Sequence, residues 1–521
     1  MKNSIFNLSD ICQNSYAKPR RCKNYAKLFL SVTFATLRLC VPLLLFSQPL
    51  FAQGYGGPLT FQGLDRTVLH SAGSSAMGGI SVGVRGDVGL MFQNPAALTS
   101  LSGLQISAGG THLSTDVEQE QNYAPVRYYP NLSVLLENLT AQIPDPDSTR
   151  LGFTPQDSVQ RAFDTIGPNW SRSSNRGAPQ QAMLATPLTS GSFKIVAGVG
   201  VVEYANLDHY YQNNNVLSPT ILSQRPLPTL RPSDGDPLHV EWSQALRSRD
   251  GAIQGYGIAV AGKIEKYNLS IGLSGLILQG SSDDFEQQTG RGRLTFYSNA
   301  FRAESLPRTI TKTGTSDFRG EELTLSSILS GRYLSIGFAM KLPMTITRKY
   351  NIQVATDSAG TSAISTMQGE EQLKLPWRGT VGLALTPREK LTFGFEYEFR
   401  PYDSVKFVDV QGNESSPWLS ASVFRIGGEY RLTPWLALRG GMRGSAEVFQ
   451  AEGNYIDGEP VTYTVYSAGV GVLISGFHVN ATYENTSTKY QDVWASAISK
   501  NSEKRHVLAA QIIYELPWLS Q

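Results

Sequence analysis

Apolar and polar residues alternate one by one along several short stretches of the chain. From Leu391 to Phe399 every odd position is apolar and every even position is threonine, glycine or glutamate, and Phe424–Leu432 alternates similarly. Successive side chains of a β-strand point to opposite faces, so this period predicts strands with one apolar and one polar face. In a soluble sandwich the apolar face meets a second sheet, whereas in a membrane barrel it meets lipid.

The lengths of the connections between these stretches separate the two classes. Short turns alternate with long polar connections, and the short turns are 190–192, 266–268, 330–332, 387–390, 433–434 and 475–476. The long connections are 114–180, 204–253, 280–321, 343–376, 400–423, 444–460 and 486–504. Outer-membrane barrels have tight periplasmic turns and long external loops, whereas a sandwich has no reason to lengthen every second connection. We therefore predict an all-β fold, a transmembrane antiparallel β-barrel.

The predicted barrel domain is 104–521 and has about fourteen strands, an even number as in single-chain bacterial barrels. The strands are predicted at 104–113, 181–189, 193–203, 254–265, 269–279, 322–329, 333–342, 377–386, 391–399, 424–432, 435–443, 461–474, 477–485 and 505–516. Closure is expected because lipid leaves no partner for the unpaired backbone groups of an open sheet edge. Trp518, after the last strand, is a candidate anchor at the membrane interface.

Residues 1–52 have the composition of a secretory signal peptide. Five basic residues between positions 18 and 27 precede an apolar stretch, densest at Leu39–Phe46, and Ser47–Ala52 is a candidate cleavage region. The apolar run is well below the roughly 20 residues that a membrane-spanning helix needs, which argues against an anchor. Without residues 1–52 the chain has 38 Lys and Arg against 42 Asp and Glu, a net charge of −4, and no cysteine. Disulfides are then excluded, and the charge does not favour nucleic acid as a partner.

Residues 53–103 precede the first predicted strand and are rich in glycine, alanine and serine. Residues 71–79 read SAGSSAMGG and residues 86–98 read GDVGLMFQNPAAL. The segment has neither the charge of a solvated linker nor the apolar density of a core helix. A fourteen-stranded barrel has a lumen wide enough to need filling, and small residues allow close packing against its wall. Because 53–103 precedes the first predicted strand, it either lies in the periplasm or folds into the lumen as a small plug, mainly helical or irregular.

The plug segment also resembles a known family. Its motif is similar to the N-terminal hatch of the FadL/OmpP1/TodX family of outer-membrane transport proteins. The motif residues are Gly86, Asp87, Asn94, Pro95 and Ala96. The likeness extends to 373–377 and 425–442 and is much weaker across 114–250 and 280–320. It implies a plugged barrel in the bacterial outer membrane that takes up hydrophobic molecules, typically long-chain fatty acids, by passive diffusion.

Two further sets of residues are candidates for the site. Four charged residues are expected to face the lumen, where they gate it, pair with one another or contact a substrate carboxylate; they are Arg425, Glu429, Arg431 and Arg439. Four leucines lie on one side of an amphipathic helix predicted over the barrel mouth. They either capture apolar ligands or only contact lipid or loops, and they are Leu132, Leu135, Leu136 and Leu139. In the hatch motif, Asn94 before Pro95 is biased away from the α region, and the pair is either a moving element or a fixed turn.

The sequence gives little support to an enzyme. Gly79–Gly83 matches G-x-S-x-G, but a nucleophile elbow needs a strand before it, a helix after it and an acid–histidine pair. The six histidines are dispersed without metal-ligand spacing, so we expect no catalytic residue, metal or cofactor. The expected partners are outer-membrane lipids, a hydrophobic small-molecule ligand and the barrel-insertion machinery. The main alternative is a related barrel that acts as a scaffold or shuttle in protein secretion at the outer membrane.

Overall fold

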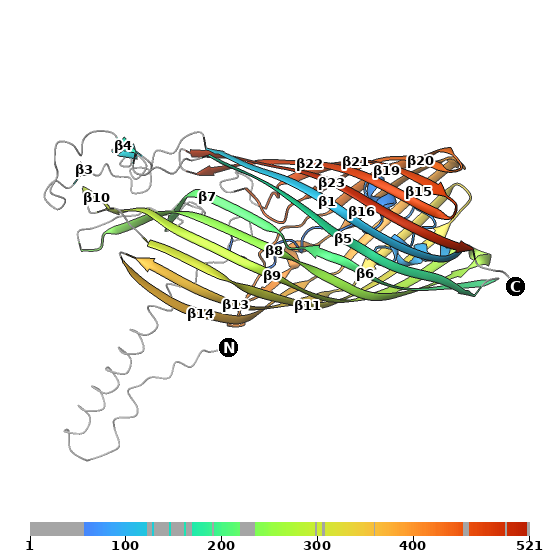
Figure 1. Ribbon diagram of the computed structural model, residues 1–521, viewed down its shortest axis with the longest axis horizontal. Coiled ribbons are helices and arrows are strands. Elements are labelled where there is room, and N and C mark those ends of the chain that lie inside the picture. The colour runs from blue at the N-terminus through green and yellow to red at the C-terminus, as the bar shows by residue number, and fades with distance from the viewer. Residues whose placement is uncertain are drawn as a thin grey trace, which may run out of the picture. The chain divides into compact units, whose positions relative to one another are not determined.

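The computed structural model describes residues 57–121, 128–129, 145–146, 161–162, 169–189, 192–218, 235–296, 300–304, 308–358, 360–451, 458–494 and 497–517. All of them belong to one compact unit, Phe51–Gln521. The strands of this unit form a closed antiparallel barrel of fourteen strands (Figure 1). Among the described residues, no helix is both long and apolar enough to cross a lipid bilayer. The predicted signal peptide, 1–52, lies outside the described residues.

The wall strands follow one another around the barrel in chain order. The first half contains β1 (Gly103–Gln121), β5 (Trp170–Thr189), β6 (Phe193–Asn206), β7 (His209–Ser218), β8 (Leu238–Ile264), β9 (Leu269–Phe296), β10 (Ala300–Glu304) and β11 (Arg308–Ser330). The second half contains β12 (Leu334–Lys341), β13 (Met344–Ser358), β14 (Thr361–Leu375), β15 (Arg378–Arg388), β16 (Leu391–Phe399), β19 (Val423–Thr433), β20 (Leu436–Ala446), β21 (Thr462–Ile474), β22 (Phe477–Trp494) and β23 (Ala497–Pro517). Shorter strands are β2 (Tyr128–Tyr129), β3 (Asp145–Pro146), β4 (Arg161–Ala162), β17 (Lys406–Val408) and β18 (Glu414–Ser415).

Pairing between the first and last strands closes the wall. β1 pairs with β23 in an antiparallel register that runs from Gly103 opposite Pro517 to Gln121 opposite Ser499. On its other side β1 pairs with β5. The two edges of the sheet therefore satisfy each other's backbone groups, as a wall surrounded by lipid requires.

Two of the wall strands that are built from two pieces are interrupted at a proline. β11 pairs with β12 through Thr324–Ser330 and with β13 through Arg308–Gly320, so β12 and β13 form one strand interrupted at Pro343. Pro376 separates β14 from β15 in the same way. Proline has no N–H to give to a ladder, which explains why both interruptions fall at prolines.

All fourteen predicted strands are present, and the predicted all-β barrel is confirmed. The short turns at 266–268, 330–332, 387–390, 433–434 and 475–476 also lie where the sequence placed them, whereas 190–191 lie outside the described residues. At one of them Ser475 and Gly476 have φ of 47° and 85°, the positive values that a two-residue type I′ hairpin requires. At another, the short helix η6 (Glu265–Tyr267) ends at Asn268 with φ of 50°. The alternation of apolar and polar residues was therefore sufficient to locate the wall.

The predicted long connections are wrong in part. Much of 280–321 belongs to β9 and β11, 343–376 is largely the hairpin of β13 and β14, and 486–504 is largely the hairpin of β22 and β23. The physical reason is that these extensions have no continuous apolar face, so the period-two signal fades although the backbone ladder continues. Where the strands extend beyond the outward apolar band, their polar residues were therefore predicted to form loops.

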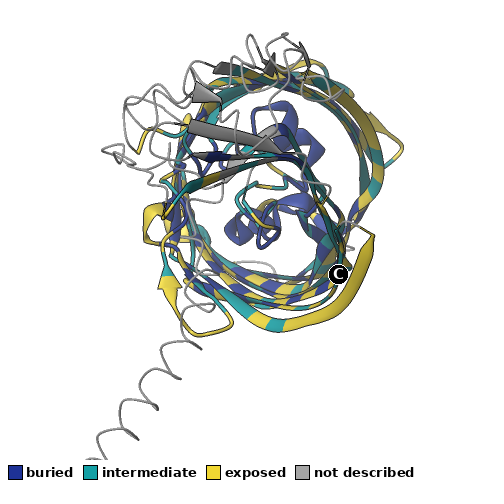
Figure 2. Cartoon of the chain, turned by 90° about the vertical axis from the view of Figure 1, so that its left-hand side faces the viewer, coloured by how far each residue is buried: buried dark blue, intermediate teal, exposed yellow. Residues whose placement is uncertain are grey.

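The two faces of the wall differ as the pattern predicts. On β16 the outward residues Phe393, Phe395 and Tyr397 are 44%, 36% and 50% exposed, whereas the inward Glu396 and Glu398 are 2% and 7% exposed. Exposed and buried residues alternate in this way around the ring of strands (Figure 2). An outward apolar face and an inward polar face are typical of a barrel in lipid.

Residues 57–102, here called the inner segment, lie inside the ring of strands (Figure 2). The segment contains α2 (Ala72–Ala76), η2 (Val88–Leu90) and η3 (Pro95–Ser100), and almost all of their residues are buried. One more short helix among the described residues, η7 (Tyr402–Ser404), follows β16. The predicted limits of the plug domain, 53–103, stay a prediction because residues 53–56 lie outside the described part of the chain.

Candidate functional site

Asp87 of the hatch motif joins two short helices of the inner segment to the wall. Its carboxylate accepts a hydrogen bond from the Gly89 N–H at 2.8 Å and so caps η2. It also accepts one from the Ser71 hydroxyl at 2.5 Å, and Ser71 in turn caps α2 by accepting from the Ser74 N–H at 2.9 Å. Gln511 Nε2, on β23, donates to Asp87 Oδ1 at 2.9 Å. Side-chain oxygens at helix N-termini satisfy N–H groups that have no partner within the helix.

Gly86 forms the turn that leads into this arrangement. Its φ of 66° lies in the left-handed region, which glycine adopts without a steric penalty. Its N–H donates to Ser100 Oγ at 2.8 Å, and its carbonyl accepts from Gln105 Nε2 of β1 at 3.0 Å. The turn at Gly86 is therefore hydrogen-bonded both to η3 of the same segment and to the wall.

The Asn94–Pro95–Ala96 motif begins η3 and binds it to the wall. Pro95 is the first residue of the helix, where a missing backbone N–H breaks no helical hydrogen bond. The Ala96 N–H donates to Ser326 Oγ on β11 at 2.8 Å, and Asn94 Nδ2 donates to Ser81 Oγ at 3.1 Å. The motif is a turn into a helix in this structure, and whether it moves during transport stays a prediction.

Glu396 of β16 attaches the inner segment to the wall through three hydrogen bonds. Its Oε1 accepts hydrogen bonds from the Ser81 N–H at 2.6 Å, the Ser81 hydroxyl at 2.9 Å and the Val82 N–H at 2.8 Å. Its Oε2 lies 3.8 Å from Arg425 Nη1. Hydrogen bonds to a charged acceptor are about twice as strong as neutral ones, so this carboxylate holds the 81–82 backbone firmly.

Glycines of the wall let the inner segment touch the strand backbones. A Cβ atom at Gly441 would lie 2.4 Å from Met77 C, and one at Gly427 would lie 2.3 Å from Met77 O. On the opposite side of the lumen, a Cβ at Gly272 would lie 2.3 Å from Ala96 N. These distances are shorter than real Cβ contacts, so only glycine fits while the inner segment occupies its place. The fit is a packing arrangement of neighbouring backbones, which the sequence pattern alone did not reveal.

The four predicted lumen charges fall into two groups. Arg425 is buried and pairs with Glu398, and it lies near Glu396. Glu429 pairs with Arg431 Nε at 2.9 Å and with Arg439 Nε at 2.8 Å, so this one carboxylate binds both arginines. Their part in transport stays a prediction. The candidate capture residues lie outside the described residues; they are Leu132, Leu135, Leu136 and Leu139.

Sequence reasoning missed a cluster of ion pairs nearer the end of the barrel with the long connections. Asp284 accepts from Arg249 Nε at 2.7 Å, from Arg348 Nη2 at 2.9 Å and from Ser316 Oγ at 2.7 Å. Arg348 Nη1 also donates to Glu371 at 2.8 Å. These residues fell mostly in stretches that were predicted as loops. Asp284 and Ser316 continue the alternation of inward residues along β9 and β11. Longer predicted strands would have placed both side chains in the lumen.

A second missed cluster contains more cations than carboxylates. Lys341 Nζ donates to Glu322 Oε1 at 2.6 Å, Tyr204 OH donates to Glu322 Oε2 at 2.8 Å, and Arg378 pairs with the same carboxylate. Glu322 thus serves two cations, and it is fully covered by its surroundings.

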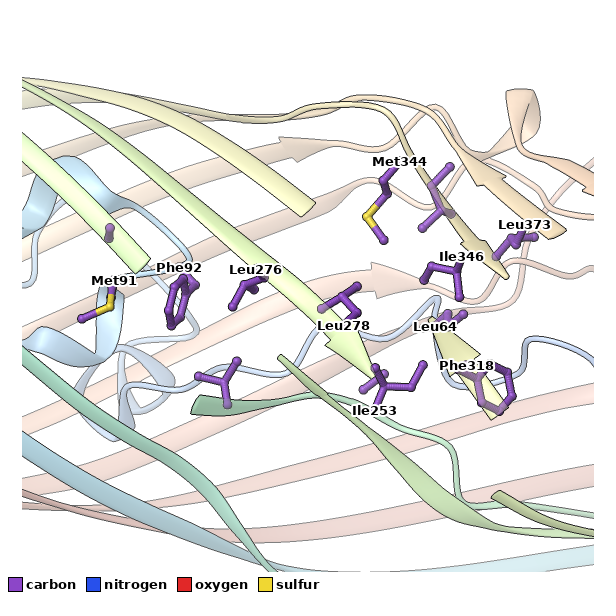
Figure 3. Packing of buried hydrophobic residues seen from close by; sticks show 14 of the residues in the cluster. Leu64, Met91, Phe92, Ile253, Leu276, Leu278, Phe318, Met344, Ile346 and Leu373 are labelled. Atoms are coloured by element: carbon purple, nitrogen blue, oxygen red, sulfur yellow. The ribbon is translucent and has the colours of Figure 1, made fainter. Parts of the chain in front are cut away.

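A buried apolar cluster fills part of the space between the wall and the inner segment. It combines inward side chains of β8, β9, β11, β13 and β14 with side chains of the inner segment (Figure 3). We call it the apolar stripe; its labelled members are Leu64, Met91, Phe92, Ile253, Leu276, Leu278, Phe318, Met344, Ile346 and Leu373. Barrel interiors are ordinarily polar, so a contiguous apolar stripe on the inward face requires an explanation.

His70 makes the inner segment sensitive to acid. Its Nε2 lies 3.0 Å from the Glu203 carbonyl, and burial lowers the pKa of the ring from 6.5 to about 4, with Lys341 adding to the effect. The protonated ring is therefore disfavoured in the folded protein but not in the unfolded chain. The neutral ring's contribution to the free energy of unfolding is therefore expected to be fully present above pH 6.5. It should be lost as the pH falls from 6.5 to about 4, by about 3 kcal/mol in total.

We expect amide hydrogen exchange around residues 68–76 to accelerate at pH 5 relative to pH 7.5, after correction for the intrinsic rate. The His70→Gln variant keeps a hydrogen-bond donor without titrating, and it should lose this pH dependence. Equal acceleration in both proteins would mean that another group carries the effect.

Solved barrel structures are similar to this chain over most of its length, among them the two described here. No protein-family model and no curated protein sequence matches the chain. The crystal structure of a Pseudomonas aeruginosa FadL homologue superposes with a TM-score of 0.53 at 11% identity and covers 86% of this chain and 98% of that one. The P. putida toluene transporter TodX has a TM-score of 0.51 at 13% identity and covers 86% and 99%. The chain therefore has the fold of these outer-membrane proteins, and the resemblance read from the sequence is confirmed for the fold.

Proposed function

We propose that this chain is an outer-membrane channel that admits hydrophobic small molecules by passive diffusion through its lumen. The observation that carries the proposal is the apolar stripe, which runs along the inward face of five strands and onto the inner segment. The side chains of the stripe are buried against one another, so an entering hydrocarbon must displace some of them, while each Å² of its own apolar surface that leaves water contributes about 25 cal/mol. The fold shared with a toluene transporter supports the proposal.

The inner segment explains why such a channel would not leak. Its contacts with β1, β9, β11, β16 and β23 hold it across the lumen, and the wall glycines leave little space between the two. A wide aqueous pore would let ions and sugars pass, whereas a filled lumen with apolar contacts favours molecules that can displace apolar side chains.

The substrates proposed are long-chain fatty acids and uncharged hydrocarbons. Fatty acids are favoured by the cluster at Glu322, where Lys341 and Arg378 share one carboxylate next to Met344 of the stripe. Guanidinium and ammonium groups bind carboxylates well, and the acyl chain would lie on the stripe. We propose that the barrel is surrounded by the lipids of the bacterial outer membrane and that the barrel-insertion machinery places it there.

Uptake by living cells tests the proposal. A host that lacks its own channel for hydrophobic compounds should accumulate labelled oleate or toluene faster when it carries this protein. Replacing Leu278 by asparagine places an amide in the stripe, where an unpaired polar group costs about 1–3 kcal/mol, so we expect uptake to fall about tenfold. Leu278→Met keeps the site apolar and should retain most of the activity.

Each outcome decides between the candidate functions. Uptake equal to that of the empty host, from a protein that is inserted and folded, would contradict the channel. If a partner protein copurified with the barrel in that case, the alternative of a scaffold in protein secretion would be favoured. Equal uptake by Leu278→Asn and Leu278→Met would show that molecules do not pass along the stripe.

A further inference from the structure

A groove of about 660 Å³ lies on the outward side of the wall, across β16, β19, β20, β21 and β22. Its aromatic residues Tyr397, Phe424 and Tyr466 are 50%, 45% and 61% exposed. They alternate along their strands with buried inward residues such as Glu396 and Arg425. The groove therefore opens to the surroundings of the barrel, and it is separate from the apolar stripe in the lumen.

A single missing side chain creates much of the hollow. Gly444 on β20 lies opposite Phe424 on one side and Thr464 on the other. A Cβ atom at Gly444 would meet nothing within 4 Å. The side chains of Phe424 and Thr464 therefore lie on either side of an open space at Gly444. The volume of the groove is in the range of ordinary ligand pockets.

The groove crosses the limit of the outward apolar band. On the side of the short turns, the outward residues of β19 and β22 are apolar or aromatic, such as Tyr430 and Tyr483. On the other side, the groove is lined by hydroxyl and amide groups, among them Thr464 and Asn485. Further along β22 lies Lys489. Its lining residues include no charged side chain, so the groove suits an apolar body joined to an uncharged hydrogen-bonding group.

We propose that this groove binds one acyl chain of a membrane lipid, with the lipid's ester carbonyl accepting a hydrogen bond from the Thr464 hydroxyl. A lipid is the occupant because the groove continues the apolar surface that faces the membrane, and because the uncharged lining matches the acyl–ester junction rather than an ionic head group. The inference rests on the membrane location proposed above and is independent of transport through the lumen.

Native mass spectrometry of the purified barrel tests this proposal. The protein is incubated with palmitoyl-oleoyl-phosphatidylcholine in detergent, and the lipids retained per barrel are counted. Gly444→Phe fills the groove and should reduce the occupancy of the tightest lipid at least tenfold. Gly440 lies on the same outward face with only one atom, Ser467 O at 4.0 Å, near its virtual Cβ, so Gly440→Phe is the matched control and should retain the lipid.

A second variant does not add volume to the wall. Thr464→Val keeps the shape of the side chain but removes the hydroxyl, and it should lower occupancy about fivefold, as expected for one hydrogen bond. Equal retention by wild type, Gly444→Phe and Thr464→Val would overturn the proposal, and so would displacement of the lipid by saturating toluene. Uptake by Gly444→Phe cells should equal that of wild type. Failed uptake by wild type with lipid retention intact would overturn the proposed function alone.

Discussion

Replacing Glu396 by alanine is expected to detach the 81–82 region of the inner segment and to make the barrel conduct ions. The substitution removes the acceptor of three hydrogen bonds and leaves the Ser81 and Val82 N–H groups without it. Removing one partner of a buried charged pair costs about 3–5 kcal/mol, so the detached state should become more populated by at least a hundredfold. Conductance of single barrels in a planar bilayer measures the effect directly.

Glu484→Ala is the matched control for this prediction. Glu484 is an inward carboxylate with comparable burial, but it binds Arg443 through two bonds of 2.7 Å rather than the inner segment. Loss of that pair should lower the stability of the barrel without increasing conductance. If Glu484→Ala conducts as well as Glu396→Ala, barrel destabilisation rather than detachment would be the cause.

Gly441→Ala should displace the inner segment, whereas Gly440→Ala should leave it in place. The two glycines are neighbours on β20 and face opposite sides of the wall. A methyl group at 441 would lie 2.4 Å from Met77 C and 2.5 Å from Gly78 N, whereas one at 440 has its nearest contact at 4.0 Å. A clash with backbone cannot be relieved by a rotamer change, and overpacking costs typically 1–3 kcal/mol or more.

Limited proteolysis of residues 71–98 and bilayer conductance measure this displacement. We expect Gly441→Ala to be cleaved at least tenfold faster than wild type and to conduct. Gly440→Ala should match wild type or be slightly more stable, because alanine reduces the entropy of the unfolded chain. Equal behaviour of the two variants would mean that the inner segment does not rest on this strand.

The wall could be predicted from the sequence because the apolar outward residues of a lipid-facing strand alternate with its polar inward residues. Phe393, Phe395 and Tyr397 mark one face, and Glu396 and Glu398 mark the other. Where both faces are polar the signal disappears, which is why the outer parts of β9, β11, β13 and β14 were predicted as loops.

The site was less accessible to sequence reasoning. Asp284 meets Arg249 and Arg348, which are 35 and 64 residues away in the chain, and only the strand register brings them together. The stripe combines one or two inward residues from each of five strands, none of which stands out in its own neighbourhood. The hatch motif was found because its residues are adjacent in sequence, but its partners, Ser326 and Gln511, were not.

The central claim is that hydrophobic molecules, and not ions, pass through a lumen filled by the inner segment. Proteoliposomes that contain the purified protein test it in one preparation, with transfer of labelled oleate and toluene measured beside potassium conductance. We predict transfer above that of empty liposomes together with negligible conductance in wild type, and conductance in Gly441→Ala. Free conduction of potassium by wild type, or transfer no faster than through empty liposomes, would contradict the account.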